Sequence, residues 1–207
     1  MRRVTPKNTI GTPSKQTRSL YVKQFQALDM LKKKSIVVRE AAPSEGDFFL
    51  TLTVDRTSLS PCILASPTAD FEPSLTGRFP FPYANPDLGG KSSLLKAVAT
   101  HLQLPAEAYE NLAQLLQSLW QIFREKEGYL LEVRTNLSSS SLEVRGARFG
   151  FDDAAYKSSG RQEEVHKLRN KAEEVPEEVE AEKDGIVYVK CVSQVLSVAA
   201  ANRFIEL

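Results

Sequence analysis

The residues whose types and spacing could do chemistry lie in two neighbouring segments, 129–137 and 142–149, which a run of serines joins. Apolar and polar residues alternate along both segments, and this pattern predicts a β-hairpin. Alternate residues of a strand share one face of the sheet. One face of the first strand would then carry its polar side chains, Glu132, Arg134 and Asn136.

A metal site is the first chemistry to consider on this face. Glu132 could give an oxygen to Mg²⁺, but a hard dication needs several oxygen ligands. The second strand offers Arg145 and Arg148 instead, and Arg134 stands two residues from Glu132. Because like charges repel, these guanidinium groups disfavour a dication. The sequence therefore predicts an ion pair between Glu132 and Arg134, and no metal.

Other segments carry weaker chemical features. The Gly-Gly-Lys-Ser run at 89–92 precedes a predicted helix, whose N-terminus could receive an anion. The run lacks the spacing of a phosphate-binding P-loop and follows no strand, so an ordinary helix start is favoured. His101 and His166 have no cysteine or carboxylate cluster at ligand spacing, and Ser138–Ser141 lacks the context of a catalytic serine. No catalytic residue is predicted.

Hydrophobic periodicity predicts the elements that must position these residues. Strands are predicted at 35–39, 47–54, 61–66, 129–137, 142–149 and 185–192. Helices are predicted before residue 35, at 91–102, between Pro105 and Gly128, and at 194–207. The stretch 67–93 is rich in proline and glycine and is predicted to be a loop. This order of elements predicts a mixed α/β (α+β) fold, with helices packed on a sheet.

Charge is distributed unevenly along the chain. The formal net charge is +1, yet residues 1–39 carry ten Lys or Arg against the single acid Asp29, which leaves −8 on the remainder. Seven acids lie between Glu173 and Asp184, where a solvated linker or helix is favoured. A basic arm on an acidic body favours a separate anionic partner for the arm. The predicted RNA-contacting residues are Arg2, Arg3, Lys7, Lys15, Arg18, Lys23, Lys32, Lys33 and Lys34.

Residues 1–24 admit two interpretations. The segment is basic, rich in Thr, Ser and Pro, and free of acids, which is typical of a mitochondrial presequence. The same composition suits an extended arm that lies on nucleic acid. Pro6 and Pro13 disfavour a long amphipathic presequence helix. Composition alone leaves both interpretations open.

Length and composition bound the architecture. The 207 residues, 42% of them apolar, suffice for one sizeable core, and no apolar run is long enough for a membrane span. Cys62 and Cys191 lie too far apart in sequence for a metal-ligand spacing or a disulfide framework, which is typical of a reducing compartment. The predicted divisions are an arm with a short helix at 1–34, a main domain at 35–160, a charged linker at 161–183 and a strand–helix unit at 184–207.

Four segments, in this order and spacing, carry a resemblance to a known family: 37–66, 110–133, 146–157 and 184–207. They include the helix that runs into "LLEVRTNL" and the stretch "GARFGFDDAAYK". Together, residues 35–207 resemble the ATP-grasp region of the succinate–CoA ligase beta subunit and the entry into its ligase domain. The resemblance implies a partial ATP-grasp-like sheet, preceded here by an extended basic arm.

The same resemblance places the family's metal site. In that family an Asn and an Asp hold Mg²⁺, at the positions of Arg134 and Gly146 here, beside Glu132. The family's glycine-rich loop corresponds to residues 192–198, which contain no glycine. The phosphate-gripping half would lie upstream, where the residues before the match are too few to hold it. Since phosphoryl transfer depends on positioning and charge neutralisation, Glu132, Arg134 and Gly146 are expected to be a vestigial metal site without ATP-dependent activity.

The leading functional hypothesis is a non-catalytic structural component of the mitochondrial ribosome, located in the mitochondrial matrix. Its basic arm would contact rRNA, and its body would contact neighbouring ribosomal proteins. No cofactor, small-molecule substrate or membrane span is expected. The alternatives are an accessory or regulatory partner of succinate–CoA ligase, and a surviving nucleotide-binding enzyme.

Overall fold

The computed structural model describes residues 19–68, 73–138, 141–152, 162–169, 176–184 and 186. Five predicted RNA-contacting residues lie outside the described residues, namely Arg2, Arg3, Lys7, Lys15 and Arg18. The predicted helix at 194–207 and nearly all of the predicted strand at 185–192 also lie outside them.

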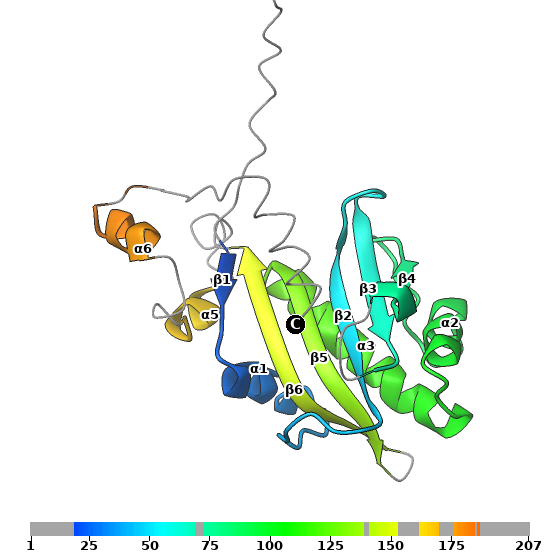
Figure 1. Cartoon of the computed structure of the whole chain (residues 1–207). Helices are drawn as coiled ribbons and strands as arrows, with labels where there is room; N and C mark the ends of the chain where they lie inside the picture. Colours follow the sequence, from blue (N-terminus) through cyan, green and yellow to red (C-terminus); the bar gives the residue numbers. More distant parts are fainter. Residues whose placement is uncertain are drawn as a thin grey trace, which may run out of the picture.

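A six-stranded antiparallel sheet forms the centre of the molecule, with the strand order β1-β6-β5-β2-β3-β4 (Figure 1). The strands are β1 (Ser19–Tyr21), β2 (Asp47–Asp55), β3 (Ser60–Ser66), β4 (Gly77–Pro80), β5 (Gly128–Ser138) and β6 (Ser141–Asp152). Two hairpins, β2–β3 and β5–β6, adjoin through the pairing of β2 with β5. The four central strand predictions are therefore confirmed.

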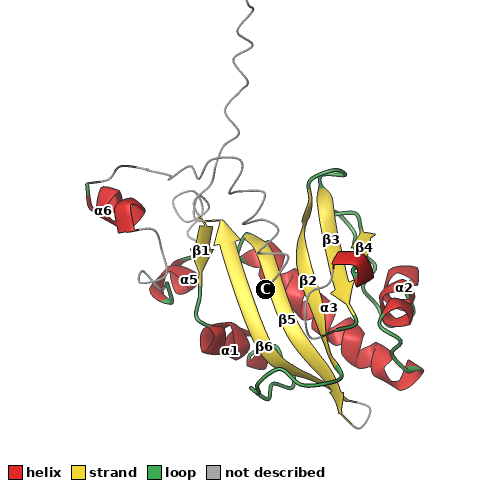
Figure 2. Cartoon of the chain, in the orientation of Figure 1, coloured by secondary structure: helices red, strands yellow, loops and turns green. Residues whose placement is uncertain are grey.

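The helices are α1 (Gln24–Lys32), α2 (Ser93–His101), α3 (Tyr109–Glu125), α5 (Glu163–Lys167) and α6 (Pro176–Lys183), with 3₁₀ turns at Pro73–Leu75 and Ala106–Ala108. Helices α1, α2 and α3 contact this sheet, and α3, the longest, lies across one of its faces (Figure 2). The predicted mixed α/β class is confirmed. No helix within the described ranges is both long and apolar enough to cross a membrane.

The core lies between α3 and the sheet. Leu112, Leu115 and Leu119 recur at helical spacing on α3, and each is at most 1% exposed. They belong to one buried cluster with the β5 residues Leu131 and Val133. Each fully buried leucine contributes about 2 kcal/mol through apolar burial. This packing fixes which face of β5 is apolar, and so leaves its polar residues on the opposite face.

The first described residues belong to the same core. Leu20 of β1, and Leu28 and Leu31 of α1, are almost completely buried. β1 pairs with the end of β6, and α1 packs against that strand. β1 and α1 are thus anchored to the sheet. The predicted division at residue 34 stays a prediction.

Two of the local predictions were wrong. Residues 35–39 form no strand, because Ser35 takes a left-handed conformation (φ 62°) after α1 and only an isolated parallel bridge links Val38 to Val144. The loop predicted at 67–93 contains the edge strand β4, which begins with a glycine and ends with a proline and was missed for that reason. β4 is held by the Phe79 ring, which meets the His101 ring edge-on at 5.7 Å between centroids.

Candidate functional site

The hairpin β5–β6 places the predicted vestigial site on the face of the sheet away from the core. Leu131, Val133 and Thr135 are completely buried, whereas Glu132 and Arg134 are only partly buried. The predicted division of β5 into an apolar and a polar face is therefore confirmed. Across the hairpin, Glu132 stands opposite Arg148, and Arg134 stands opposite Gly146.

A β-bulge shapes this site. The pairing shifts between Arg134 and Thr135, so that Arg145 is an extra residue on β6 between the partners Gly146 and Val144. A bulge of this kind lets two neighbouring residues of one strand face a single residue of the other. Arg145 and Gly146 thus both lie against Arg134, while the strand regains its apolar face at Ala147.

Asp47, the first residue of β2, is the centre of the polar cluster. Its carboxylate is completely buried, with Arg134 Nε 3.2 Å from Oδ2 and Arg145 Nη1 3.1 Å from Oδ1. Asn136, its partner across the strands, donates a hydrogen bond of 2.8 Å to Oδ1. The backbone N–H and hydroxyl of Ser44 donate two more, at 3.0 and 3.2 Å. Strands β2, β5 and β6 are thereby joined through one carboxylate.

Arg134 lies flat against Gly146. A Cβ added at Gly146 would lie 3.3 Å from Arg134 Nη2, so the missing side chain provides the space for the guanidinium group. Arg134 Nη2 also donates to the backbone oxygens of Ala41 and Arg145. The prediction of an ion pair between Arg134 and Glu132 was wrong, because the Arg134 guanidinium group pairs with Asp47 instead.

The cluster keeps Asp47 ionised. Burial is the largest single influence on this carboxyl and opposes its charge. The hydrogen bonds from Asn136 and Ser44, together with the positive charge of Arg145, outweigh it and lower the pKa of Asp47 below its ordinary value of 3.8. An ionised Asp47 in turn neutralises part of the charge that the two arginines bring.

Glu132 has a different environment from Asp47. Burial raises its pKa above the ordinary value of 4.5, and the Arg148 charge only partly offsets this. The Arg148 guanidinium group lies over the Tyr21 ring, with Cζ 5.0 Å from the ring centroid. Within the described part of the chain, no hydrogen bond or ion pair joins Glu132 to Arg134. Glu132 is therefore a partly desolvated carboxyl whose charged neighbour is Arg148.

These residues do not fit a magnesium ion. The Arg134 guanidinium group fills the space over Gly146, and Asp47 is fully engaged by two cations and three hydrogen-bond donors. Within the described part of the chain, no group of three or more His, Cys, Asp or Glu side chains is arranged to hold a metal. Mg²⁺ prefers six oxygen ligands in octahedral geometry, and this cluster presents guanidinium nitrogens instead.

Four of the predicted RNA-contacting residues are described by the structure, and they lie at the two ends of α1. Lys23 precedes the helix and is exposed, while Lys32, Lys33 and Lys34 follow one another at its end. Lys33 pairs with Asp29 at 3.1 Å and Lys34 pairs with Glu125 of α3 at 3.7 Å. Lys33 and Lys34 thus line a cavity together with residues of α3, whereas Lys23 lies at the other end of α1.

Sequence reasoning missed Asp47 and overlooked the role of Arg145. The sequence pattern predicts Asp47 only as the first residue of a strand, but Gly46 before it forms a turn (φ 81°) that brings Ser44 to the Asp47 carboxylate. A charged residue directly before the apolar run Phe48–Leu50 could have indicated a buried partner. The position of Arg145 beside Arg134 depends on the bulge, so the regular alternation of a strand could not predict it.

Comparison with known proteins finds distant relatives of this chain. No protein-family model matches the chain. The mitochondrial ADP-forming succinate–CoA ligase beta subunit of Neurospora crassa is 26% identical over 163 residues, 75% of this chain and 36% of that protein. The corresponding mitochondrial GDP-forming subunit of Dictyostelium discoideum is 27% identical over 168 residues, 76% of this chain and 39% of that protein.

The chain is thus a distant homologue of succinate–CoA ligase beta subunits, at low identity. The ADP-forming beta subunit of Nitratiruptor sp. is 27% identical over 166 residues, 76% of this chain and 42% of that protein. The chain spans about two fifths of the length of these relatives. Among solved structures, ATP citrate lyase of Methanosaeta concilii is similar with a TM-score of 0.41 and 12% identity, over 72% of this chain and 41% of that one.

Proposed function

We propose that this chain is a non-catalytic relative of the succinate–CoA ligase beta subunits that serves as a structural component of the mitochondrial ribosome. The observation that supports a loss of catalysis is the position of the Arg134 guanidinium group, which lies over Gly146 and is paired with the buried Asp47. A positive group occupies the place where the family resemblance assigns a metal. Metal-assisted phosphoryl transfer at this position would need the opposite charge.

The charge distribution supports a role within an RNA-containing assembly. Residues 1–39 carry ten Lys or Arg and one acid, on a chain whose formal net charge is only +1. Dispersed cations of this kind bind phosphates without reading sequence, as ribosomal arms must along folded RNA. Two of the relatives are mitochondrial by name, which supports placing the chain in the mitochondrial matrix. The folded body would then contact neighbouring ribosomal proteins.

Incorporation into the ribosome is tested by removing residues 1–24. The truncated chain carries an unrelated mitochondrial presequence, so that import is preserved whichever role the native segment has. In a sucrose gradient of mitochondrial lysate, the full-length protein should sediment with a ribosomal subunit, and the truncated protein should stay near the top. Normal sedimentation of the imported, truncated protein would overturn the proposed role of the arm. Absence of the full-length protein from the ribosomal fractions would overturn the proposed ribosomal function itself.

The loss of nucleotide chemistry is tested separately by calorimetry. Millimolar MgATP should give no saturable heat with the purified protein. A succinate–CoA ligase beta subunit treated in the same way serves as the positive control. Saturable binding by this chain would favour the surviving nucleotide-binding enzyme over a structural component.

The distant homology also supports a second candidate, an accessory partner of succinate–CoA ligase. Such a partner would bind the ligase in place of the beta subunit that it resembles over about three quarters of its own length. Affinity purification of the tagged chain from mitochondria distinguishes the two candidates. Recovery of ligase subunits without ribosomal proteins would favour the accessory role.

A further inference from the structure

The C-terminal end of α3 separates two cavities. One has a volume of about 660 Å³ and is lined by Tyr83, Ala84 and the end of α3. The other has a volume of about 520 Å³ and lies between α3, α1 and α5. Glu125 and Lys126 line both cavities, which makes them neighbours around one helix end.

Cations outnumber acids on the walls of these cavities. The basic residues that line them are Lys33, Lys34, Arg124, Lys126 and Lys167, and the acids are Glu125 and Glu164. The two acids pair with lysines of the same walls, Glu125 with Lys34 and Glu164 with Lys126. Both carboxylate side chains are at least half exposed, which makes these pairs weak, and the side chains of Lys34 and Lys126 are 28% and 23% exposed.

An exposed aromatic ring stands beside the cations. Tyr83 is 57% exposed, and its ring meets the Trp120 ring edge-on at 5.3 Å between centroids. Trp120 is itself fixed by edge contact with Phe81 and by stacking on Phe123. The Tyr83 ring is therefore supported from behind while much of it stays open to solvent.

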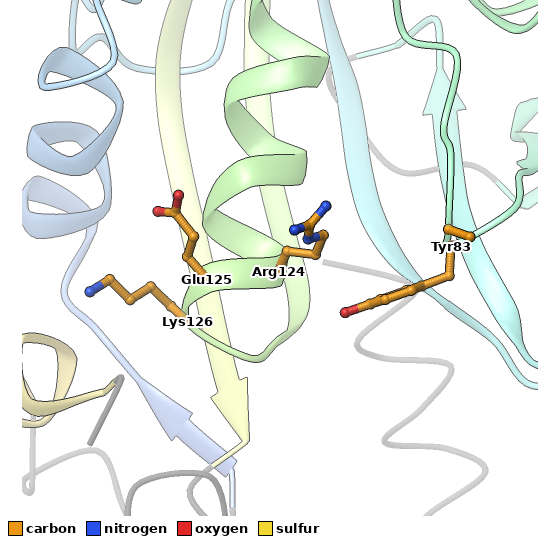
Figure 3. A pocket seen from close by; sticks show the side chains of 5 residues that line it. Tyr83, Arg124, Glu125 and Lys126 are labelled. Atoms are coloured by element: carbon orange, nitrogen blue, oxygen red, sulfur yellow. The ribbon is translucent and has the colours of Figure 1, made fainter. Parts of the chain in front are cut away.

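Figure 3 shows how these groups are arranged around the end of α3. Arg124 lies on the side of the helix that faces Tyr83, and Glu125 and Lys126 point to the other side, toward α1. Cations thus flank the helix end on both sides, with one aromatic ring at the outer edge. A single small anion would engage only one of the two sides.

We propose that this surface binds single-stranded RNA, with a base stacked on Tyr83 and successive phosphates bound by Arg124, Lys126 and the lysines of the second cavity. Exposed aromatic rings beside Lys and Arg are the usual platform for unpaired bases, and stacking contributes without reading sequence. The successive phosphates of an RNA strand can bind cations that are spread over two cavities, which a single small anion cannot do. This inference rests on the proposed RNA-contacting function, and it assigns part of that contact to the folded body in addition to the arm.

The test measures binding of the full-length protein to a fluorescein-labelled oligouridine of about 12 nucleotides, a length typical of single-strand sites. Tyr83→Ala should weaken binding about 5-fold to 150-fold, the range of one lost base stack, and Tyr83→Phe should retain it. Arg124→Gln combined with Lys126→Gln should weaken binding and lower the salt dependence by about 1.4 in log–log slope, for two lost phosphate contacts. The matched control is Arg56→Gln combined with Lys96→Gln, two exposed cations on other elements.

Fluorescence locates the contact within the protein. Trp120 is the only tryptophan and lies against Tyr83, so RNA stacked there should change its emission, and Tyr83→Ala should abolish that change.

Thermal unfolding confirms that each variant is folded. Wild-type affinity in Tyr83→Ala and in the double variant would overturn the inference, as would equal competition by a polyglutamate peptide. Sedimentation with the ribosome tests the proposed function independently, so the two failures are distinguishable.

Discussion

The Arg134 side chain of β5 and the Asp47 side chain of β2 form a buried ion pair, with Nε 3.2 Å from Oδ2. The Arg134 side chain is only 13% exposed and the Asp47 side chain is completely buried. The pair lies where two hairpins of the sheet meet, and Arg145 joins it from a third strand. Charges that are this well buried stabilise a fold only when all of them are present, because each alone is costly to desolvate.

Asp47→Ala is therefore expected to lower the free energy of unfolding by about 3–5 kcal/mol, since it leaves two guanidinium groups without their carboxylate. Urea denaturation measures the loss. Asp29→Ala is the matched control, because it breaks the exposed Lys33–Asp29 pair, whose side chains are 74% and 58% exposed. That control should change stability by less than about 1 kcal/mol. Equal effects of the two substitutions would contradict the structural role of Asp47.

Gly146→Ala tests whether the guanidinium group needs the space over that glycine. The added Cβ would lie 3.3 Å from Arg134 Nη2, and Arg134 cannot move away while Asp47 holds it. Overpacking of this kind should cost about 1–3 kcal/mol in urea denaturation. In an Arg134→Ala background the same substitution should be neutral or stabilising by up to about 1 kcal/mol, through the lower entropy of the unfolded chain. An unchanged cost in that background would show that Arg134 is not the obstacle.

Periodicity predicted the parts of the fold that repeat. The apolar stripe of α3 and the alternation along β5 follow from helix and strand geometry, and the structure buries Leu112, Leu119 and Val133 as expected. The predicted polar face of β5 followed from the same alternation. These features depend on neighbours in sequence, which a single chain displays directly.

The partners within the site could not be predicted in this way. Arg134 was expected to pair with Glu132, two residues along its own strand, but its partner Asp47 is distant in sequence and close only through the pairing of β2 with β5. The bulge at Arg145 breaks the period-two pattern and leaves no clear mark in the sequence. The edge strand β4 was missed because its four residues include a glycine and a proline.

Ser92→Ala tests the interpretation of the Gly-Gly-Lys-Ser run as an ordinary helix start. The Ser92 hydroxyl accepts a hydrogen bond of 3.0 Å from the Leu95 backbone N–H, and Ser92 is buried. Loss of this cap should lower the free energy of unfolding by about 1 kcal/mol. Ser93→Ala, at the adjacent exposed position, is the matched control and should have little effect. A result in which Ser92→Ala is as mild as its neighbour would leave the cap without an energetic role.

The pH dependence of stability should report the ionised state of Asp47. Its pKa is lowered on folding, so the unfolded chain binds a proton more readily, and ionisation stabilises the fold above the ordinary value of 3.8. That stabilisation is lost as the pH falls through the folded-state pKa. Denaturation curves of the wild type and Asp47→Asn, compared across this acidic range, should therefore converge as the pH decreases. A constant difference between them would mean that Asp47 does not titrate with unfolding.

Glu132 should show the opposite sign. Burial raises its folded-state pKa above 4.5, so the folded chain holds its proton more tightly, and stability falls as the pH rises from about that value through the folded-state pKa. Glu132→Gln should therefore stabilise the protein at neutral pH, with a gain that disappears below pH 4.5. The exposed Glu163→Gln on α5 is the matched control and should change stability little. If Glu132→Gln were instead destabilising at neutral pH, the attraction of Arg148 would outweigh desolvation, and the carboxylate would be a structural charge.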